Sequence, residues 1–388
     1  MKKKKTIFVG LSGGVDSAVS AMLLKKQGYE VVGVFIKTWH PEFIVCNEEQ
    51  ERIDSMRVAA ALDIPFLVFN LEDVYKREVA DYMIREYRAG RTPNPDVMCN
   101  KEVKFGAFLK KAFSMGADFV ATGHYAQIGN SLEGIDDSKK SPLKPITYNL
   151  KTSPDKGKDQ SYFLWTLKQE QLKKILFPVG SLKKSEVRIL AKKFNLPVAE
   201  KKDSQGICFL GAVDLKEFLK HYIKSKKGKV VLAPRSLGEV GNKKGDEIGY
   251  HDGAVFYTLG ERHGFTIPKK KPTDGAYYVV GKDIKKNILM VSQKSPLLDK
   301  EGVGGGNSKK NHSVLKGAPP QRGGEIKIQN TNWINEIPEP NKTYTAQIRY
   351  HGEFLPCRII CQGASLTRLS RMPLDITFDI TKVIFEKP

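Results

Sequence analysis

Short apolar runs alternate with amphipathic stretches in the N-terminal part of the chain. The apolar runs have the length and composition of buried strands and lie at residues 6–9, 31–36, 66–69 and 119–122. The stretches between them place apolar residues at helical spacing and lie at residues 18–27, 48–62, 74–89 and 105–115. Strands that alternate with helices predict an α/β fold with a doubly wound parallel sheet, which binds ligands at the carboxyl ends of its strands.

The pattern changes after about residue 211, beyond a further helix predicted near residues 184–194. Short β-like runs with turn residues between them, typical of small β domains or barrels, lie at 229–232, 255–259, 276–280, 288–291, 343–350 and 355–360. Polar residues fill a predicted exposed loop at 129–145 and a flexible insertion at 299–324. We therefore expect a catalytic domain at residues 1–210, a small, mostly β central domain at 211–275 and a C-terminal β-barrel domain at 276–388.

The chain is strongly basic, with 64 Lys and Arg residues against 43 Asp and Glu residues among its 388 and a formal net charge of +21. Such an excess favours a nucleic-acid partner through phosphate contacts, although solubility or a lysine-rich genome accounts for it equally well. No apolar run approaches the ~20 residues of a membrane helix, and the lysine run at residues 2–5 is not followed by the apolar core of a signal peptide. We therefore expect a cytoplasmic protein without a membrane partner.

The chain has five cysteines, which are Cys46, Cys99, Cys208, Cys357 and Cys361. An odd number in a long chain without a secretion signal argues against a framework of structural disulfides. Cys357 and Cys361 have no second Cys or His pair nearby, so we expect packing residues there and no metal site.

The segment Ser-Gly-Gly-Val-Asp-Ser at residues 12–17 lies between the first predicted strand and the first predicted helix. Gly13 and Gly14 allow successive backbone N–H groups to converge on one anion, and the helix N-terminus that follows adds its free amides. Both serine hydroxyl groups can donate hydrogen bonds, whereas Asp16 would repel a bare phosphate and is expected to contact Mg²⁺ or cap the helix. No Lys-Ser/Thr pair follows, so this is not the loop of P-loop kinases or GTPases. A glycine-rich turn without a ligand is the alternative.

Two cysteines far apart in the sequence are candidates for sulfur chemistry. Cys99 is predicted to lie in a loop just before a helix, with Lys101 close by, a setting that lowers the pKa of a thiol. Asp96 lies three residues earlier and can handle a proton or accept a hydrogen bond from a base. Cys208 lies in an apolar segment after Gly206, where a packing role is equally ordinary. Together they fit persulfide transfer, in which one cysteine carries the outer sulfur and the other attacks the disulfide to release it.

Several segments in one order resemble the motifs of a known family. They include GRTPNPDVMCNKEVKFG at 90–106 and KKDSQGICFLG at 201–211, and further segments lie at 121–126, 158–164, 176–180, 258–264, 278–283 and 349–352. This order resembles that of the tRNA-specific 2-thiouridylases, and residues 12–17 resemble the pyrophosphate loop of the N-type ATP pyrophosphatases. The match covers most of residues 5–385.

The resemblance implies a role for each matching position. ATP would be held by Gly10, Leu11, Ser12, Gly13, Gly14, Val15, Asp16, Ser17, Ile36 and Gly123, and the family commonly has Met at the position of Ile36. The target uridine would meet Asn94, Pro95 and Asp96, the last of them also catalytic. Further tRNA contacts would come from His124, Lys158, Asp159, Gln160, Arg349 and Tyr350. Cys208 would carry the persulfide, and Cys99 would be the nucleophile or resolving thiol.

The implied reaction is ATP-dependent 2-thiolation of the wobble uridine of tRNA. ATP with Mg²⁺ would adenylate the C2 carbonyl, persulfide sulfur on Cys208 would displace AMP, and a Cys99–Cys208 disulfide would remain. A cysteine desulfurase or a sulfur-relay protein would supply the sulfur. The family's terminal β-hairpin would follow residues 383–388, where the chain stops, so we expect the last barrel to lack strands and leave an open edge.

Three other functions can be compared with the sequence, and two of them, an adenylating enzyme and an RNA-binding relative, stay open. One is another adenylating ATP pyrophosphatase, such as an amidotransferase, although the sequence shows no glutaminase-type cysteine motif. A cluster-dependent tRNA thiolase would need a CxxC motif, which the sequence lacks. The other is a catalytically impaired RNA-binding relative, against which intact Asp16, Asp96 and both cysteines argue.

Overall fold

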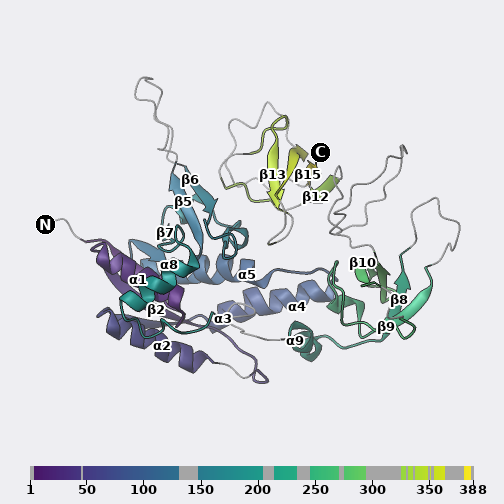
Figure 1. Cartoon of the computed structure of the whole chain (residues 1–388), viewed down its shortest axis with the longest axis horizontal. Coiled ribbons are helices and arrows are strands. Elements are labelled where there is room, and N and C mark those ends of the chain that lie inside the picture. The colour runs from purple at the N-terminus through teal and green to yellow at the C-terminus, as the bar shows by residue number, and fades with distance from the viewer. Residues whose placement is uncertain are drawn as a thin grey trace.

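A computed structural model of the protein describes residues 4–44, 47–130, 147–203, 214–233, 245–270, 275–293, 325–328, 331–334, 337–347, 350, 354–362 and 380–385. Along the chain these residues form an α/β part, a second part built on a mixed sheet and a third part built on an antiparallel sheet (Figure 1). The insertion expected at 299–324 and most of the loop expected at 129–145 lie outside the described residues. In the described ranges no helix is both long and apolar enough to cross a membrane.

The first part is built on five parallel strands, which confirms the predicted doubly wound α/β fold. From edge to edge the strands are β3 (Phe66–Asn70), β2 (Glu30–Lys37), β1 (Thr6–Gly10), β4 (Phe119–Ala121) and β7 (Ile175–Leu176). The chain runs outward from β1 through β2 to β3 and then returns to β4 on the other side of β1. The carboxyl ends of β1 and β4 therefore lie side by side where the strand order reverses, which is the usual ligand position in such sheets.

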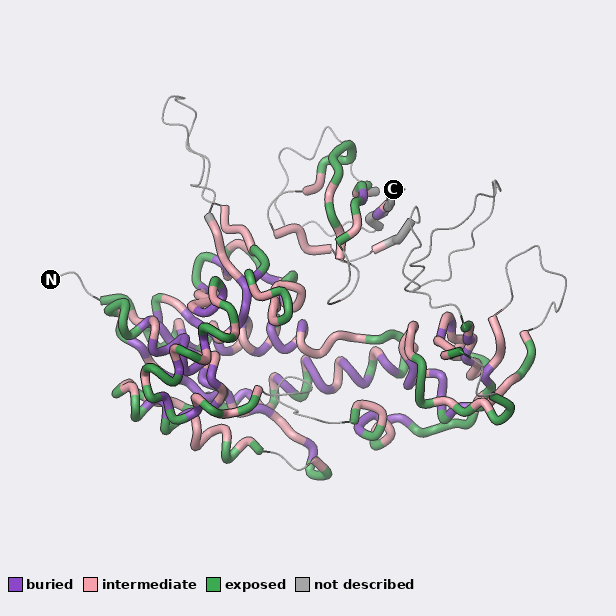
Figure 2. Tube along the Cα trace, viewed as in Figure 1, coloured by how far each residue is buried: buried purple, intermediate pink, exposed green. Residues whose placement is uncertain are grey.

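Alternate residues of β1 pack into two separate cores. Ile7 and Val9 lie in one core, and Phe8 lies in the other. The helices that contribute to the first core are α1 (Val15–Lys26), α2 (Glu48–Ala61) and α8 (Lys184–Lys193). Those of the second core include α3 (Glu72–Tyr75), η1 (Lys76–Ala80), α4 (Asp81–Arg88), η2 (Cys99–Phe108), α6 (Leu109–Ser114) and α7 (Gln169–Leu172). Because side chains alternate between the faces of a strand, helices cover both faces, and Figure 2 shows buried residues concentrated in this part.

The second part joins α9 (Leu215–Tyr222) to a four-stranded sheet. The strand order is β10 (Tyr278–Asp283), β11 (Ile288–Ser292), β8 (Gly228–Leu232) and β9 (Glu247–His251). The domain boundary expected between residues 275 and 276 falls inside this sheet, because β11 pairs with β8. The strand expected at 255–259 is instead a short 3-10 helix, η4 (Ala254–Phe256), whose buried side chains give a similar apolar pattern.

The end of α4 connects the first and second parts. Arg88 Nη2 donates a hydrogen bond of 2.7 Å to the carbonyl oxygen of Tyr222, the last residue of α9. Figure 1 shows α4 running from the parallel sheet towards the sheet of β8 to β11. This helix therefore contributes to the contact between the two parts.

The third part is an antiparallel sheet with the order β12 (Glu325–Ile328), β15 (Ile380–Phe385), β14 (Phe354–Gln362) and β13 (Tyr344–Gln347). Cys357, predicted to be a packing residue, is buried in it. Hydrogen bonds attach this part to the first. Asn332 Nδ2 donates to the Trp165 carbonyl oxygen at 2.7 Å, and Gln169 Nε2 donates to the Ile334 carbonyl oxygen at 2.6 Å.

Candidate active site

The turn between β1 and α1 closes on itself through hydrogen bonds. Ser17 Oγ accepts a hydrogen bond from the Ser12 backbone N–H at 3.2 Å and donates one to the Gly14 carbonyl oxygen at 3.1 Å. Gly13 has a φ of +69°, and a β-carbon there would lie 2.6 Å from the Glu51 carbonyl oxygen, so only glycine fits. The predicted phosphate loop therefore has the strand, turn and helix that an anion site of this kind requires.

Gly123 follows β4 and lies against the first turn of α1. A β-carbon on Gly123 would lie 2.7 Å from the backbone nitrogen of Ser17 and 2.8 Å from the backbone carbonyl carbon of Asp16. The structure thus brings together Gly123 and the glycine loop at the point where the strand order reverses. Ile36 is buried near the carboxyl end of β2, where it pairs with Phe69 of β3.

The carboxylate of Asp16 is held by two residues that the sequence motifs did not single out. Tyr125 Oη donates a hydrogen bond to Asp16 Oδ1 at 2.7 Å, and Lys184 Nζ donates to Oδ1 and Oδ2 at 2.7 and 2.8 Å. Burial and the neighbouring charge of Asp16 raise the pKa of Tyr125 well above its ordinary value, so the phenol stays a donor. Asp16 therefore faces a cation from α8 at the mouth of the loop.

A second carboxylate, Asp203, gathers three cations beside Asp16. Lys158 Nζ, Lys184 Nζ and Arg188 Nη2 lie 2.6, 2.8 and 2.6 Å from its oxygens. Burial alone would raise the pKa of Asp203, but hydrogen bonds from the two lysines outweigh burial and hold the pKa well below its ordinary value. The ionised carboxylate ties α8 to the segment that precedes Cys208, and Cys208 itself lies outside the described residues.

Cys99 lies inside a helix rather than in a loop before one. Helix α5 (Pro95–Met98) begins directly after Asn94, whose side chain accepts hydrogen bonds from the backbone N–H groups of Asp96 at 3.1 Å and Val97 at 3.3 Å. An Asn cap followed by Pro at the first helical position is a favoured helix start. The predicted loop before Cys99 is therefore shorter than expected, and the residues predicted to meet the uridine form the start of α5.

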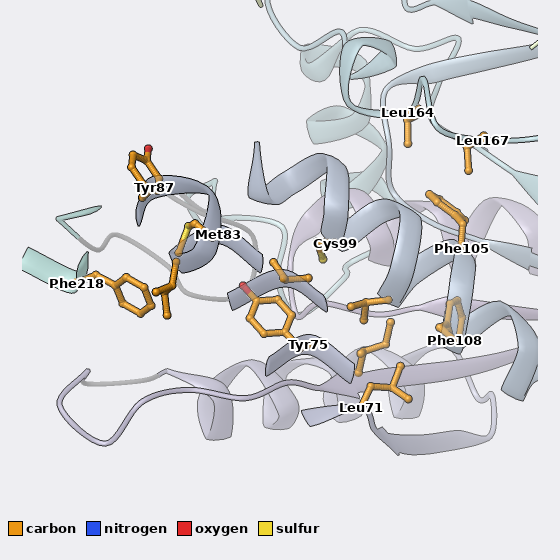
Figure 3. Close-up of a cluster of buried hydrophobic side chains, with 14 of the residues drawn as sticks. Leu71, Tyr75, Met83, Tyr87, Cys99, Phe105, Phe108, Leu164, Leu167 and Phe218 are labelled. Atoms are coloured by element: carbon orange, nitrogen blue, oxygen red, sulfur yellow. The ribbon is translucent and has the colours of Figure 1, made fainter. Parts of the chain in front are cut away.

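The Cys99 side chain is 0% exposed, and Figure 3 shows it among buried side chains. It belongs to the same core as Tyr75 and Met83. Lys101, expected beside the thiol, instead forms an ion pair with Glu102 Oε1 at 2.9 Å. A substrate therefore reaches this thiol only if the groups that cover it move.

The helix continues from Cys99 through the π-helical stretch η2. Asn100 Nδ2 donates a hydrogen bond to the Phe163 carbonyl oxygen at 3.1 Å, and Gln171 Nε2 donates to the Phe105 carbonyl oxygen at 2.7 Å. These two hydrogen bonds connect η2 to Phe163 and Gln171. The turns of a π-helix are wider than those of an α-helix. Such π-helical turns are frequent at functional sites.

The sequence is similar to known proteins over most of its length. Residues 5–212 match the family model described as the tRNA methyl transferase HUP domain, and residues 216–293 match the tRNA methyl transferase PRC-barrel domain. The chain is 47% identical over 293 residues to tRNA-specific 2-thiouridylase MnmA of Streptococcus thermophilus, covering 75% of this chain and 73% of the relative. A protein of the same name from Listeria monocytogenes is 47% identical over 290 residues, covering 74% and 71%. The chain belongs to the family of tRNA-specific 2-thiouridylases.

Family membership makes the chain an enzyme of the sulfurtransferase class, as its motifs indicated. Similarity to solved structures is weaker. U34-tRNA thiolase NcsA from Methanococcus maripaludis is 17% identical with a TM-score of 0.32, covering 57% of this chain and 68% of that chain. A 4-thiouridine synthetase in complex with RNA and bound ATP is 19% identical with a TM-score of 0.32, covering 56% and 50%.

His124, expected to contact tRNA, lies inside the first part. Its side chain is 7% exposed, and its ring centroid lies 5.7 Å from each of the rings of Phe105 and Phe177. Its Nδ1 lies 2.6 Å from Thr122 Oγ1. Burial and the positive charge of Lys104 keep the pKa of His124 well below its ordinary value, so the ring is neutral at pH 7. The contact of His124 with tRNA stays a prediction.

The tRNA contacts expected at residues 158–160 are engaged within the protein. Lys158 binds Asp203. Gln160 makes two hydrogen bonds with the backbone of Tyr125. The Gln160 backbone N–H donates to the Tyr125 carbonyl oxygen at 2.8 Å, and Gln160 Oε1 accepts from the Tyr125 backbone N–H at 3.0 Å. Asp159 accepts hydrogen bonds from two nearby backbone N–H groups. Lys158 and Gln160 are thus connected to the surroundings of Asp16 through Asp203 and Tyr125, and the contacts of residues 158–160 with tRNA stay a prediction.

The last expected tRNA contacts belong to the third part. Arg349 lies outside the described residues. The ring of Tyr350 lies 4.7 Å from the ring of Phe163 and 5.8 Å from that of Tyr162. Since the Phe163 carbonyl also accepts the hydrogen bond from Asn100, Tyr350 lies on the segment that contacts the Cys99 helix.

Proposed function

We propose that this chain uses ATP to replace the C2 oxygen of the wobble uridine of tRNA with sulfur. The observation that supports this best is the joint placement of the glycine loop, Gly123 and Asp16 where the strand order of the sheet reverses. Relatives in the family carry the name tRNA-specific 2-thiouridylase, and the net charge of +21 suits a tRNA partner.

The first step of the proposed reaction is adenylation. The phosphates of ATP bind the loop N–H groups and the N-terminus of α1, and the Mg²⁺ that enters with ATP binds the Asp16 carboxylate. The C2 oxygen of the uridine attacks the α-phosphorus, and the bond from that phosphorus to the pyrophosphate oxygen breaks. The C2 carbon then carries AMP, which leaves far more readily than the original oxygen.

Sulfur transfer follows adenylation. The terminal sulfur of a persulfide on Cys208 attacks C2, and AMP leaves. The Cys99 thiolate then attacks the Cys208 sulfur, which breaks the sulfur–sulfur bond, releases 2-thiouridine and leaves a Cys99–Cys208 disulfide for a dithiol reductant. A cysteine desulfurase or a sulfur-relay protein reloads Cys208. Asn94, Pro95 and Asp96 at the start of α5 meet the target base, where the carboxylate handles a proton or accepts a hydrogen bond.

Transfer of ³⁵S from cysteine to unmodified tRNA tests the proposal. The assay contains this protein, a cysteine desulfurase, Mg-ATP and tRNA, with Cys208→Ser as the control variant. We expect ATP-dependent label in 2-thiouridine from the wild type and none from Cys208→Ser, which still binds ATP. Folded wild-type protein that binds Mg-ATP but never labels tRNA would contradict the proposal and favour an RNA-binding relative without this catalysis.

A further inference from the structure

Lys184 lies between two carboxylates at the mouth of the glycine loop. Its Nζ lies 2.7 and 2.8 Å from the two carboxylate oxygens of Asp16 and 2.8 Å from Asp203 Oδ1. The Lys184 side chain is only 14% exposed. An ammonium group has three N–H donors, so carboxylate oxygens occupy all of them in this structure.

The position of Asp16 shows where the positive charge of Lys184 lies. Asp16 is in the first turn of α1, and the next residue, Ser17, closes the loop through the Ser12 N–H. The ammonium group that contacts Asp16 therefore lies beside the anion-binding end of the helix. The polyphosphate of ATP is the group that this end of the helix favours.

We infer that Lys184 is the phosphate-binding cation of this ATP site and that Asp203 is the residue that positions it. When Mg-ATP enters, Mg²⁺ takes the Asp16 carboxylate, and the Lys184 donors freed from Asp16 turn to phosphate oxygens. The inference rests on the ATP site of the proposed function and adds a residue to which no role in the reaction is otherwise assigned.

Asp203 is suited to hold Lys184 while Asp16 changes partners. Lys158 and Arg188 both hold the Asp203 carboxylate at 2.6 Å. Arg188 is itself anchored, because its Nη1 donates to the Ala199 carbonyl oxygen at 3.0 Å. One carboxylate oxygen of Asp203 thus stays on Lys184 after Asp16 has turned to the metal, which keeps the ammonium group at the loop.

The competing explanation is a purely structural cluster that fastens α8 to α1. The two explanations differ in their effect on nucleotide affinity, so the test is equilibrium binding of Mg-ATP to the full chain without tRNA or a sulfur donor. We expect Lys184→Gln to weaken Mg-ATP binding by about 10- to 100-fold, the usual effect of losing a hydrogen bond to a charged group. Lys183→Gln, at an exposed neighbouring position, is the matched control and should bind as the wild type does.

A double-mutant cycle tests the positioning role of Asp203. Asp203→Asn should weaken binding less than Lys184→Gln does, and it should have no further effect when added to Lys184→Gln, because Asp203 acts through that lysine. Additive losses would overturn the positioning role. If Lys184→Gln does not fold, Lys184→Arg serves instead, since it keeps the charge and should retain most of the affinity.

The outcomes separate this inference from the proposed function. Wild type and Lys184→Gln that bind Mg-ATP equally tightly would overturn the role of Lys184 even if wild-type protein thiolates tRNA. If Lys184→Gln weakens Mg-ATP binding but the wild type never labels tRNA, the role of Lys184 in binding ATP stands and the proposed thiolation is contradicted.

Discussion

Gly123 and Ser17 lie so close together that a β-carbon on Gly123 would be 2.7 Å from the backbone nitrogen of Ser17. This contact joins the end of β4 to the start of α1, and hence the two sides of the crevice where the strand order reverses. Space, and not backbone freedom, makes glycine necessary at position 123.

We expect Gly123→Ala to weaken Mg-ATP binding by about tenfold or more, because forcing an extra carbon into a packed contact typically costs about 1–3 kcal/mol. Equilibrium binding of Mg-ATP measures the effect. Gly157→Ala is the matched control, since a β-carbon there would approach only Asp155 Oδ1, at 3.5 Å. If Gly123→Ala binds Mg-ATP as tightly as the wild type does, the end of β4 can move away from the loop without loss of Mg-ATP affinity.

Asp203→Asn should lower the melting temperature in a pH-dependent way. The pKa of Asp203 is lower in the folded protein than the ordinary value of ~4, so its ionised contacts stabilise the fold above that pH. This stabilisation is lost as the pH falls from ~4 towards the folded pKa, and the difference from wild type should shrink there. Glu200→Gln, where the side chain is 81% exposed, is the control and should show little difference at any pH. A constant deficit for Asp203→Asn across the whole pH range would rule out its charge as the cause.

Alkylation by iodoacetamide should be slow at Cys99 in the free protein. Because the side chain is fully buried, reaction requires local opening, and a rate about 100-fold below that of the unfolded chain corresponds to an opening free energy of ~2.7 kcal/mol. Site-resolved mass spectrometry would measure the rate, with the partly exposed Cys361 as an internal comparison. Equal rates at Cys99 and Cys361 would contradict the burial of Cys99.

Asn94→Ala should reduce the free energy of unfolding by about 1 kcal/mol, because the backbone N–H groups of Asp96 and Val97 lose their acceptor. Asn94→Asp should keep most of that stability, since a carboxylate also caps a helix. Chemical denaturation compares the two variants. If both lose the same amount, the amide of Asn94 has a role other than capping.

The predictability of the site depends on how far apart its residues are in the sequence. The loop at residues 10–17 is contiguous, so its strand, turn and helix follow from local pattern. The contact between Asp16 and Lys184 depends on how α8 packs beside α1, which no local pattern encodes. The sequence does carry one local signal for this contact. Lys184 is the first residue of α8, where a positive charge opposes the helix dipole and so implies a nearby anion.

The differences in fold have related causes. The boundary expected after residue 275 separates two strands that pair in space, because β8 lies before it and β11 after it. The sequence at the start of α5 favours a loop because Asn and Pro are both common in loops, although Asn94 followed by Pro95 also fits a cap and first helical position. The burial of Cys99 could not be foreseen, because it depends on the packing of the Cys99 helix beside α3 and α4.

The groups around Asp16 come from the β1–α1 turn, the end of β4, residues 158–160, the start of α8 and Asp203. These segments are far apart in the sequence, so the proposed ATP site would exist only in the fully assembled first part. A ligand that binds only the assembled form shifts the folding equilibrium towards it, by about 2.7 kcal/mol at one hundred times its Kd. Under the proposed function, the nucleotide consumed in each turnover would therefore also be a stabilising ligand of the domain that consumes it.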